Sequence, residues 1–89
     1  MLIPRYRVLL GVEKVEIIWK LGTLLEREGI SVYKLHKVLE GKVSRNTLYK
    51  LANSQPERLD LNVLCWLITG LTLLTKKTVV INDLLETTP

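Results

Sequence analysis

A short stretch that begins at Ser44 carries side chains able to hydrogen-bond to the edges of nucleic-acid bases. Arg45 and Tyr49 lie four residues apart, so a helix would place them on one face, with Asn46 beside them. Arginine can donate two hydrogen bonds to guanine, and an asparagine amide can pair in the same way with adenine. We therefore predict base contacts in the major groove of DNA from four residues: Arg45, Asn46, Thr47 and Tyr49.

Residues around this stretch could bind the phosphate backbone that flanks such bases. Ser44 can cap a helix and also donate its hydroxyl hydrogen to a phosphate, and Lys50 lies one turn beyond Asn46. The N-terminus of a helix adds its own partial positive charge. We predict phosphate contacts from Ser44, Lys50, Lys34, Lys37 and Lys42, with the alternative that the three earlier lysines serve only solubility.

The excess positive charge of the chain falls in the same region. The formal net charge of the 89 residues is +4. Between Ser31 and Arg58 there are six basic and two acidic residues, whereas the rest of the chain holds seven of each. A basic surface concentrated in one supersecondary unit is typical of proteins that bind polyanions. The charge pattern therefore favours a nucleic-acid partner.

Three short helices are predicted in the first two thirds of the chain, and they would position these side chains. Apolar residues recur with a helical period from about Glu16 to Glu28, and Gly29 suits the C-terminal cap. Ser31 is placed to cap a second helix that Gly41 ends, and Ser44 to cap a third that runs to about Asn53. The expected core positions are Ile17, Ile18, Leu21, Leu24, Leu25, Val32, Leu35, Val38, Leu39, Leu48 and Leu51.

The last third predicts one more helix and a small β element. Asp60 suits the cap of a helix, and the turn at Lys76 and Lys77 ends it. Residues 78–81 are β-branched and predict a short strand, followed by a helical turn over 83–86. We expect residues 5–10 to form a strand or an extended arm, and a strand near Val79 to pair either with them or with a second subunit. The apolar positions of the last helix are Leu61, Leu64, Cys65, Leu67, Ile68 and Leu71.

The second and third helices together have the pattern of a helix-turn-helix, which places its second helix in a major groove. The run Glu28–Leu35 and the run Val43–Leu51 resemble the phage-repressor family, the Cro-like or xenobiotic-response-element type, and Ile81–Glu86 resembles its closing segment. The resemblance implies a lambda-repressor-like domain of five helices, commonly dimeric, that regulates transcription. By position it implies that Arg45, Asn46 and Tyr49 read bases and that Ser44 and Lys50 contact the backbone.

The chain departs from the family pattern at three places. His36 stands where the family usually has a small residue, and we expect it to be at least partly buried where the second and third helices meet. Val32 stands where a phosphate-binding Gln is frequent. The turn through Leu39, Glu40, Gly41 and Lys42 is two residues longer than usual, which affects the tilt of the third helix.

Other classes of protein are disfavoured by what the sequence holds. One cysteine, Cys65, excludes a disulfide scaffold within the monomer and lies in an apolar run, so we expect it to be buried. One histidine and no Gly-rich phosphate loop give no support to an enzyme or a bound cofactor. No stretch predicts a membrane span or a signal peptide, so we expect a cytoplasmic protein. Trp19 and Trp66 are expected in the core.

These observations lead to one main expectation and two alternatives. We expect an all-α fold of four to five short helices with a small β element near residues 78–81, forming a single domain over 1–89 with a core at about 16–86 and an arm or strand at 1–12. It would bind double-stranded DNA as a transcriptional repressor and a homodimer, through the last helix or the strand near Val79. The alternatives are an antitoxin-type module that binds a toxin partner and uses DNA only to autoregulate, and a nonspecific nucleic-acid binder.

Overall fold

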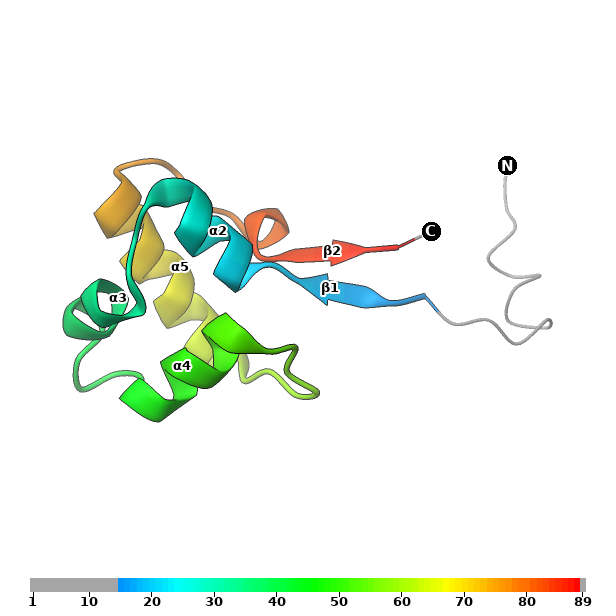
Figure 1. Ribbon diagram of the computed structural model, residues 1–89, viewed down its shortest axis with the longest axis horizontal. Helices are drawn as coiled ribbons and strands as arrows, with labels where there is room; N and C mark the ends of the chain where they lie inside the picture. Colours follow the sequence, from blue (N-terminus) through cyan, green and yellow to red (C-terminus); the bar gives the residue numbers. More distant parts are fainter. Residues whose placement is uncertain (1–14, 89) are drawn as a thin grey trace.

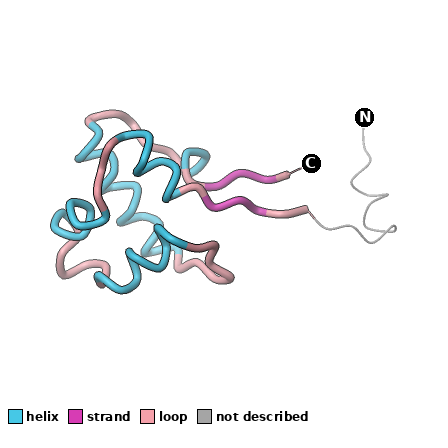
Figure 2. Tube along the Cα trace, viewed as in Figure 1, coloured by secondary structure: helices cyan, strands magenta, loops and turns pink. Residues whose placement is uncertain are grey.

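A computed structural model describes residues 15–88, so the predictions for residues 1–12 lie outside the described part of the chain. Four α-helices gather into one body and a two-stranded sheet projects from it (Figures 1 and 2). In chain order the elements are β1 (Ile17–Trp19), α2 (Leu21–Glu28), α3 (Val32–Val38), α4 (Arg45–Asn53), α5 (Leu61–Thr75), the 3-10 helix η1 (Ile81–Asp83) and β2 (Leu85–Thr87). The prediction of a mostly helical fold with a small β element is confirmed, but the β element lies elsewhere.

Local capping chemistry sets most of the helix boundaries. The Ser31 hydroxyl accepts the Lys34 N–H, the Ser44 hydroxyl accepts the Thr47 N–H, and the Asp60 carboxylate accepts two N–H groups in the first turn of α5. Each bond satisfies a donor that a helix N-terminus leaves without a partner. Gly29 ends α2 in the left-handed region at φ 68°. The caps predicted at these four positions are confirmed.

The helix predicted to start at Glu16 is wrong over its first turn, because residues 17–19 form β1. This strand pairs antiparallel with β2, and Ile18 lies opposite Glu86. β-Branched and aromatic residues suit a strand, and here the pairing partner lies almost seventy residues away in the chain. Ile17 and Ile18 are therefore exposed instead of buried, whereas Trp19 is 8% exposed and belongs to the core.

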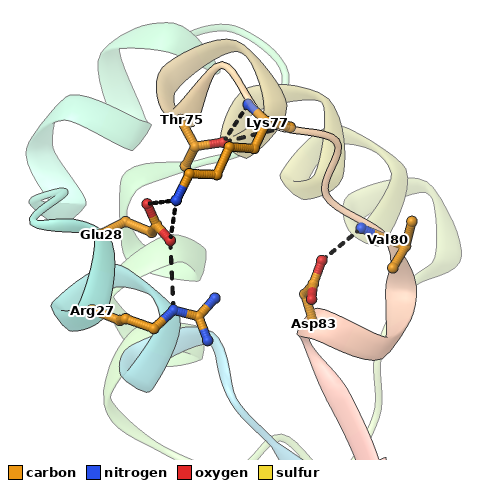
Figure 3. Close-up of polar contacts among 6 residues, drawn as sticks. All are labelled: Arg27, Glu28, Thr75, Lys77, Val80 and Asp83. Carbon is orange, nitrogen blue, oxygen red and sulfur yellow. Dashed lines mark hydrogen bonds and ion pairs between the residues drawn. The ribbon is translucent and has the colours of Figure 1, made fainter.

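The strand predicted at 78–81 and the helical turn predicted at 83–86 are also wrong. The Asp83 carboxylate accepts the Val80 N–H at 2.9 Å, as Figure 3 shows, and the Thr72 hydroxyl accepts the Val79 N–H at 3.3 Å. These donors are bonded to side chains and are not available to a strand partner. The chain then makes η1 at 81–83 and continues into β2.

Leucines from all four helices meet in one core. Two glycines lie where neighbouring segments approach each other closely. A Cβ on Gly70 of α5 would lie 3.0 Å from the Leu39 side chain, and a Cβ on Gly22 of α2 would lie 2.6 Å from the Ala52 carbonyl oxygen. The buried residues are Trp19, Leu21, Leu24, Leu25, Leu35, Leu39, Val43, Leu48, Leu51, Leu64, Leu67, Leu71, Val79 and Leu84.

Some apolar residues predicted to be buried are exposed. Val38 at the end of α3 is 39% exposed, and Leu61 at the start of α5 is 73% exposed. The Cys65 thiol is exposed too. Trp66 is partly buried against the core. Leu61 and Cys65 lie one turn apart on a face of α5 that is exposed. Helical periodicity alone does not indicate which apolar face of a helix stays exposed.

An ion-pair cluster connects the end of α2 to the turn after α5 (Figure 3). The Lys77 ammonium donates to both Glu28 carboxylate oxygens, at 3.1 and 3.2 Å, and Arg27 lies 3.5 Å from the same carboxylate. The hydrogen bond from Lys77 is the main cause that lowers the pKa of Glu28, against a smaller opposing effect of burial. The cluster therefore holds the Glu28 carboxylate ionised and ties the two segments together.

Candidate nucleic-acid interface

Helix α4 has one buried face and one exposed polar face. Leu48 and Leu51 are 0% and 6% exposed and fix the inner side of the helix in the core. The opposite side exposes Arg45, Asn46, Tyr49 and Lys50, all from the sequence-predicted set. Because the inner leucines set the orientation of the helix, they also set the direction in which these polar groups project. The structure thus brings three of the four predicted base-contact residues, Arg45, Asn46 and Tyr49, together on one solvent-facing surface, whereas Thr47 is only partly exposed.

The first turn of α4 is ordered by its own side chains. The Ser44 hydroxyl accepts the Thr47 N–H at 3.2 Å and donates to the Thr47 hydroxyl at 2.8 Å. Thr47 is only partly exposed. Ser44 can therefore donate to a phosphate only by giving up its bond to the Thr47 hydroxyl, whereas the Thr47 hydroxyl accepts in this pair and keeps its own hydrogen available for donation.

Arg45 and Tyr49 form a cation–π pair on the exposed face. The guanidinium carbon of Arg45 lies 5.6 Å from the centre of the Tyr49 ring, within the range of a cation–π interaction. The ring limits the rotamers that the arginine samples, so less conformational entropy is lost when its donors bind a partner. The Tyr49 ring, itself 37% exposed, therefore acts as a platform for Arg45.

The C-terminal end of α4 is anchored to β1. The Trp19 indole N–H donates to the Leu51 carbonyl at 2.6 Å, and the Trp19 backbone N–H donates to the Gln55 side-chain oxygen at 3.1 Å. The close approach of Gly22 to Ala52 holds the same end. The sequence predicted Trp19 as a core residue, but neither of its hydrogen bonds nor the role of Gln55 has a sequence signal.

The segment between α3 and α4 is pinned by two buried side chains. Leu39 and Val43 are 2% and 5% exposed, and Gly41 between them adopts φ 85°, where a side chain would be strained. Backbone N–H groups of Lys42 and Val43 both donate to the Leu39 carbonyl, at 2.9 and 3.1 Å. The longer turn noted in the sequence is therefore a compact, hydrogen-bonded loop that fixes the position of α4 relative to α3.

The lysines predicted to contact phosphates differ in the partners that their ammonium groups already have. Lys37 lies 3.7 Å from Glu40 and 6.0 Å from the Tyr33 ring centre, so its charge is partly compensated. Lys42 lies 5.2 Å from the Trp66 ring centre, an interaction with α5 that the sequence did not indicate. Lys34 and Lys50 are exposed, and no salt bridge to another of residues 15–88 involves them. A phosphate at Lys34, Lys42 or Lys50 would therefore displace no salt bridge among residues 15–88, whereas one at Lys37 would compete with Glu40.

His36 is partly buried, as predicted. Its Nδ1 atom is buried and has no hydrogen-bond partner among the described residues. Within residues 15–88 there is no group of three side chains that could hold a metal ion, and no helix there is long and apolar enough to cross a membrane.

Comparison with known proteins gave no relative. No protein-family model, no curated protein and no solved structure matches this chain.

Proposed function

We propose that α3 and α4 act as a helix-turn-helix of the phage-repressor type and that α4 lies in the major groove of double-stranded DNA. The observation that carries the proposal is the exposed face of α4, where Arg45, Asn46 and Tyr49 project from a helix whose other side is held by Leu48 and Leu51. The major groove is about 12 Å wide and admits one helix. The arginine would read guanine and the asparagine adenine.

The surrounding charges support a duplex partner. Lys34, Lys42 and Lys50 are available for phosphates on either side of the groove, and the capped N-terminus of α4 adds the partial charge of its helix dipole. Phosphate contacts would set the register of the protein on the duplex, and the α4 side chains would supply sequence preference. The described residues hold no effector domain, and occlusion of a promoter is the simplest action of such a binder, so we propose a transcriptional repressor.

The test is to compare binding to selected and random duplexes. A preferred sequence is first enriched from a random duplex pool with the wild-type protein, and its affinity is then measured by fluorescence anisotropy beside a scrambled duplex. We expect Arg45→Ala and Asn46→Ala each to reduce the preference for the selected duplex by about 1–3 kcal/mol, or roughly 5- to 150-fold in affinity ratio. Binding to the scrambled duplex should change much less.

Lys76→Ala is the matched control for the loss of one positive charge, because Lys76 lies at the end of α5, outside the α3–α4 unit. It should leave the preference unchanged. If the pool yields no preferred sequence, or if lysine substitutions weaken binding while the Arg45 and Asn46 variants retain the wild-type preference, the protein binds nucleic acid without reading sequence and the proposal fails.

A further inference from the structure

One large apolar side chain lies on the exposed polar face of α4. The Tyr49 ring is 37% exposed, and no other large apolar side chain among the nine residues of α4 is exposed. The residues around it on this face, Arg45, Asn46 and Lys50, are charged or polar. In the proposed complex with DNA the ring would enter the major groove with them, and burial of its apolar surface favours an apolar counterpart there.

The contact between Tyr49 and Arg45 limits the base pair that the ring could reach. The two residues are one turn apart, about 6 Å along the helix axis, and the guanidinium carbon lies 5.6 Å from the ring centre. Successive base pairs of duplex DNA are about 3.4 Å apart, so two steps span roughly 6.8 Å. With Arg45 on a guanine, the ring therefore lies beyond that guanine and within two base steps of it, at the neighbouring base pair.

The major groove offers one apolar group to such a ring. Every base pair presents hydrogen-bond donors and acceptors there, but among the unmodified bases only thymine adds a methyl group, on C5. We infer that Tyr49 contacts the C5 methyl group of a pyrimidine in the base pair next to the guanine that Arg45 binds. The inference rests on the proposed function and specifies its ligand, a guanine beside a C5-methylated pyrimidine.

This contact would make DNA binding respond to cytosine methylation. 5-Methylcytosine carries its methyl group on the same ring atom as thymine, so both bases present it at the same place in the groove. Burial of one methyl group contributes about fourfold in affinity. A site with 5-methylcytosine beside the guanine should therefore bind about four times more tightly than the same site with cytosine.

Two other groups of α4 could produce a preference for the same base pair, and each can be removed alone. The Thr47 side chain also carries a methyl group, but it is only partly exposed and its hydroxyl accepts from the Ser44 hydroxyl at 2.8 Å. Thr47→Ser removes that methyl group and keeps a hydroxyl for Ser44. The second group is the Tyr49 hydroxyl, which Tyr49→Phe removes without loss of the ring.

The test uses the full chain and the duplex enriched from the random pool. The guanine that Arg45 reads is located first, as the G·C pair whose replacement by A·T weakens binding of the wild type but not of Arg45→Ala. We expect a thymine in a base pair directly beside it. Deoxyuridine lacks only the C5 methyl group of thymine, and its introduction at that position should raise the Kd about fourfold in fluorescence anisotropy. With C·G at the same position, methylation of the cytosine should lower the Kd by the same factor.

Variants assign the methyl dependence to the ring. Tyr49→Ala should bring the ratio of the Kd values for the deoxyuridine and thymine duplexes to one, whatever it loses in overall affinity with the contact to Arg45. Tyr49→Phe and Thr47→Ser should keep the wild-type ratio. Tyr33→Ala should keep it too, because it removes an exposed ring beside a basic side chain on α3, where Lys37 lies 6.0 Å from the ring centre.

The outcomes separate this inference from the proposed function. If no duplex is enriched, or if Arg45→Ala keeps the wild-type preference, the proposed function fails and the inference fails with it. If Arg45 reads a guanine, the inference alone is overturned by the absence of a thymine beside that guanine, by equal Kd values for thymine and deoxyuridine, or by a ratio that persists in Tyr49→Ala. Loss of the ratio in Tyr49→Phe or Thr47→Ser would also overturn it, since the methyl dependence would then belong to the hydroxyl or to Thr47.

Discussion

At the scale of single residues, the proposed base contact of Arg45 would start from a side chain that already has a partner in the fold. An arginine samples many rotamers, and fixing them on binding costs about 1.5–2 kcal/mol. The Tyr49 ring already holds the guanidinium at 5.6 Å in the described structure. Lysine would be a poor replacement in the proposed base contact, because an ammonium lacks the planar group that donates two parallel hydrogen bonds.

The ion pair of Glu28 with Lys77 should make the free energy of unfolding depend on pH. Its pKa is lowered from the ordinary value of 4.5 in the folded chain, first by the hydrogen bond from Lys77. A carboxyl whose pKa is depressed by folding stabilises the protein above its unfolded pKa, and that contribution is lost as the pH falls through the folded pKa. We therefore expect Lys77→Met to lower the free energy of unfolding at pH 7, and the difference from wild type to shrink below about pH 4.5.

Urea unfolding at a series of pH values measures this difference, with Lys76→Met as the control. Lys76 is the neighbouring exposed lysine, and no salt bridge among residues 15–88 includes it. A gap between Lys77→Met and wild type that stays constant from pH 7 to pH 3 would show that the ion pair is not its source.

At the scale of elements, the contact between α2 and α4 depends on a position without a side chain. A Cβ at Gly22 would lie 2.6 Å from the Ala52 carbonyl oxygen, which is backbone and cannot move aside without shifting α4. Gly22→Ala in a free helix would add about 0.5–1 kcal/mol of stability. Here we expect a net loss of about 1–3 kcal/mol in the free energy of unfolding, measured by urea denaturation.

Thr23→Ala is the control for helix propensity, because Thr23 is the next residue of α2 and is exposed. It should leave the stability equal or slightly higher. If Gly22→Ala proves as stable as wild type, the approach of the two helices is looser than the structure indicates.

Elements whose ends are set by neighbouring residues could be predicted from the sequence, and those set by distant ones could not. Ser31, Ser44 and Asp60 cap their helices through bonds to residues two or three positions away, so the local pattern was sufficient. Residues 17–19 fit a helical period equally well, and only pairing with 85–87 makes them a strand.

In the candidate interface, too, features set by neighbouring residues could be predicted from the sequence, and features set by distant residues could not. The alternation of Leu48 and Leu51 with exposed polar residues was sufficient to place Arg45, Asn46 and Tyr49 on one surface. The contact of Lys42 with Trp66 needs two segments brought together by the fold, so the sequence gives no sign of it. The exposure of Cys65 was not predictable either, because an apolar residue in a helical sequence pattern looks the same whether its face is buried or exposed.

At the scale of the whole molecule, the uneven charge predicts how binding responds to salt. Each phosphate contact made by a cationic side chain releases counterions, and the slope of log affinity against log salt changes by about 0.9 for each such contact on duplex DNA. We expect Lys50→Gln to make that slope shallower by about one unit and to weaken binding to all duplexes alike.

Lys76→Gln, which removes the same charge from the end of α5, should leave the slope near the wild-type value. Fluorescence anisotropy across a salt series measures both. An equal decrease in slope for the two variants would mean that overall charge, and not a contact at α4, governs the response.

The pairing of β1 with β2 has a mechanical consequence. The Thr88 N–H donates to the Glu16 carbonyl at 2.9 Å, and the Glu16 N–H donates to the Thr88 hydroxyl at 3.1 Å. The residue before β1 and the residue after β2 therefore lie side by side at the end of the sheet that points away from the helices (Figure 1). A force applied between Glu16 and Thr88 would act perpendicular to the strands, along their hydrogen bonds, so these bonds would break one after another. The sheet would therefore open like a zipper at low force, and the helices would bear load only after the Trp19 anchor to α4 had been reached.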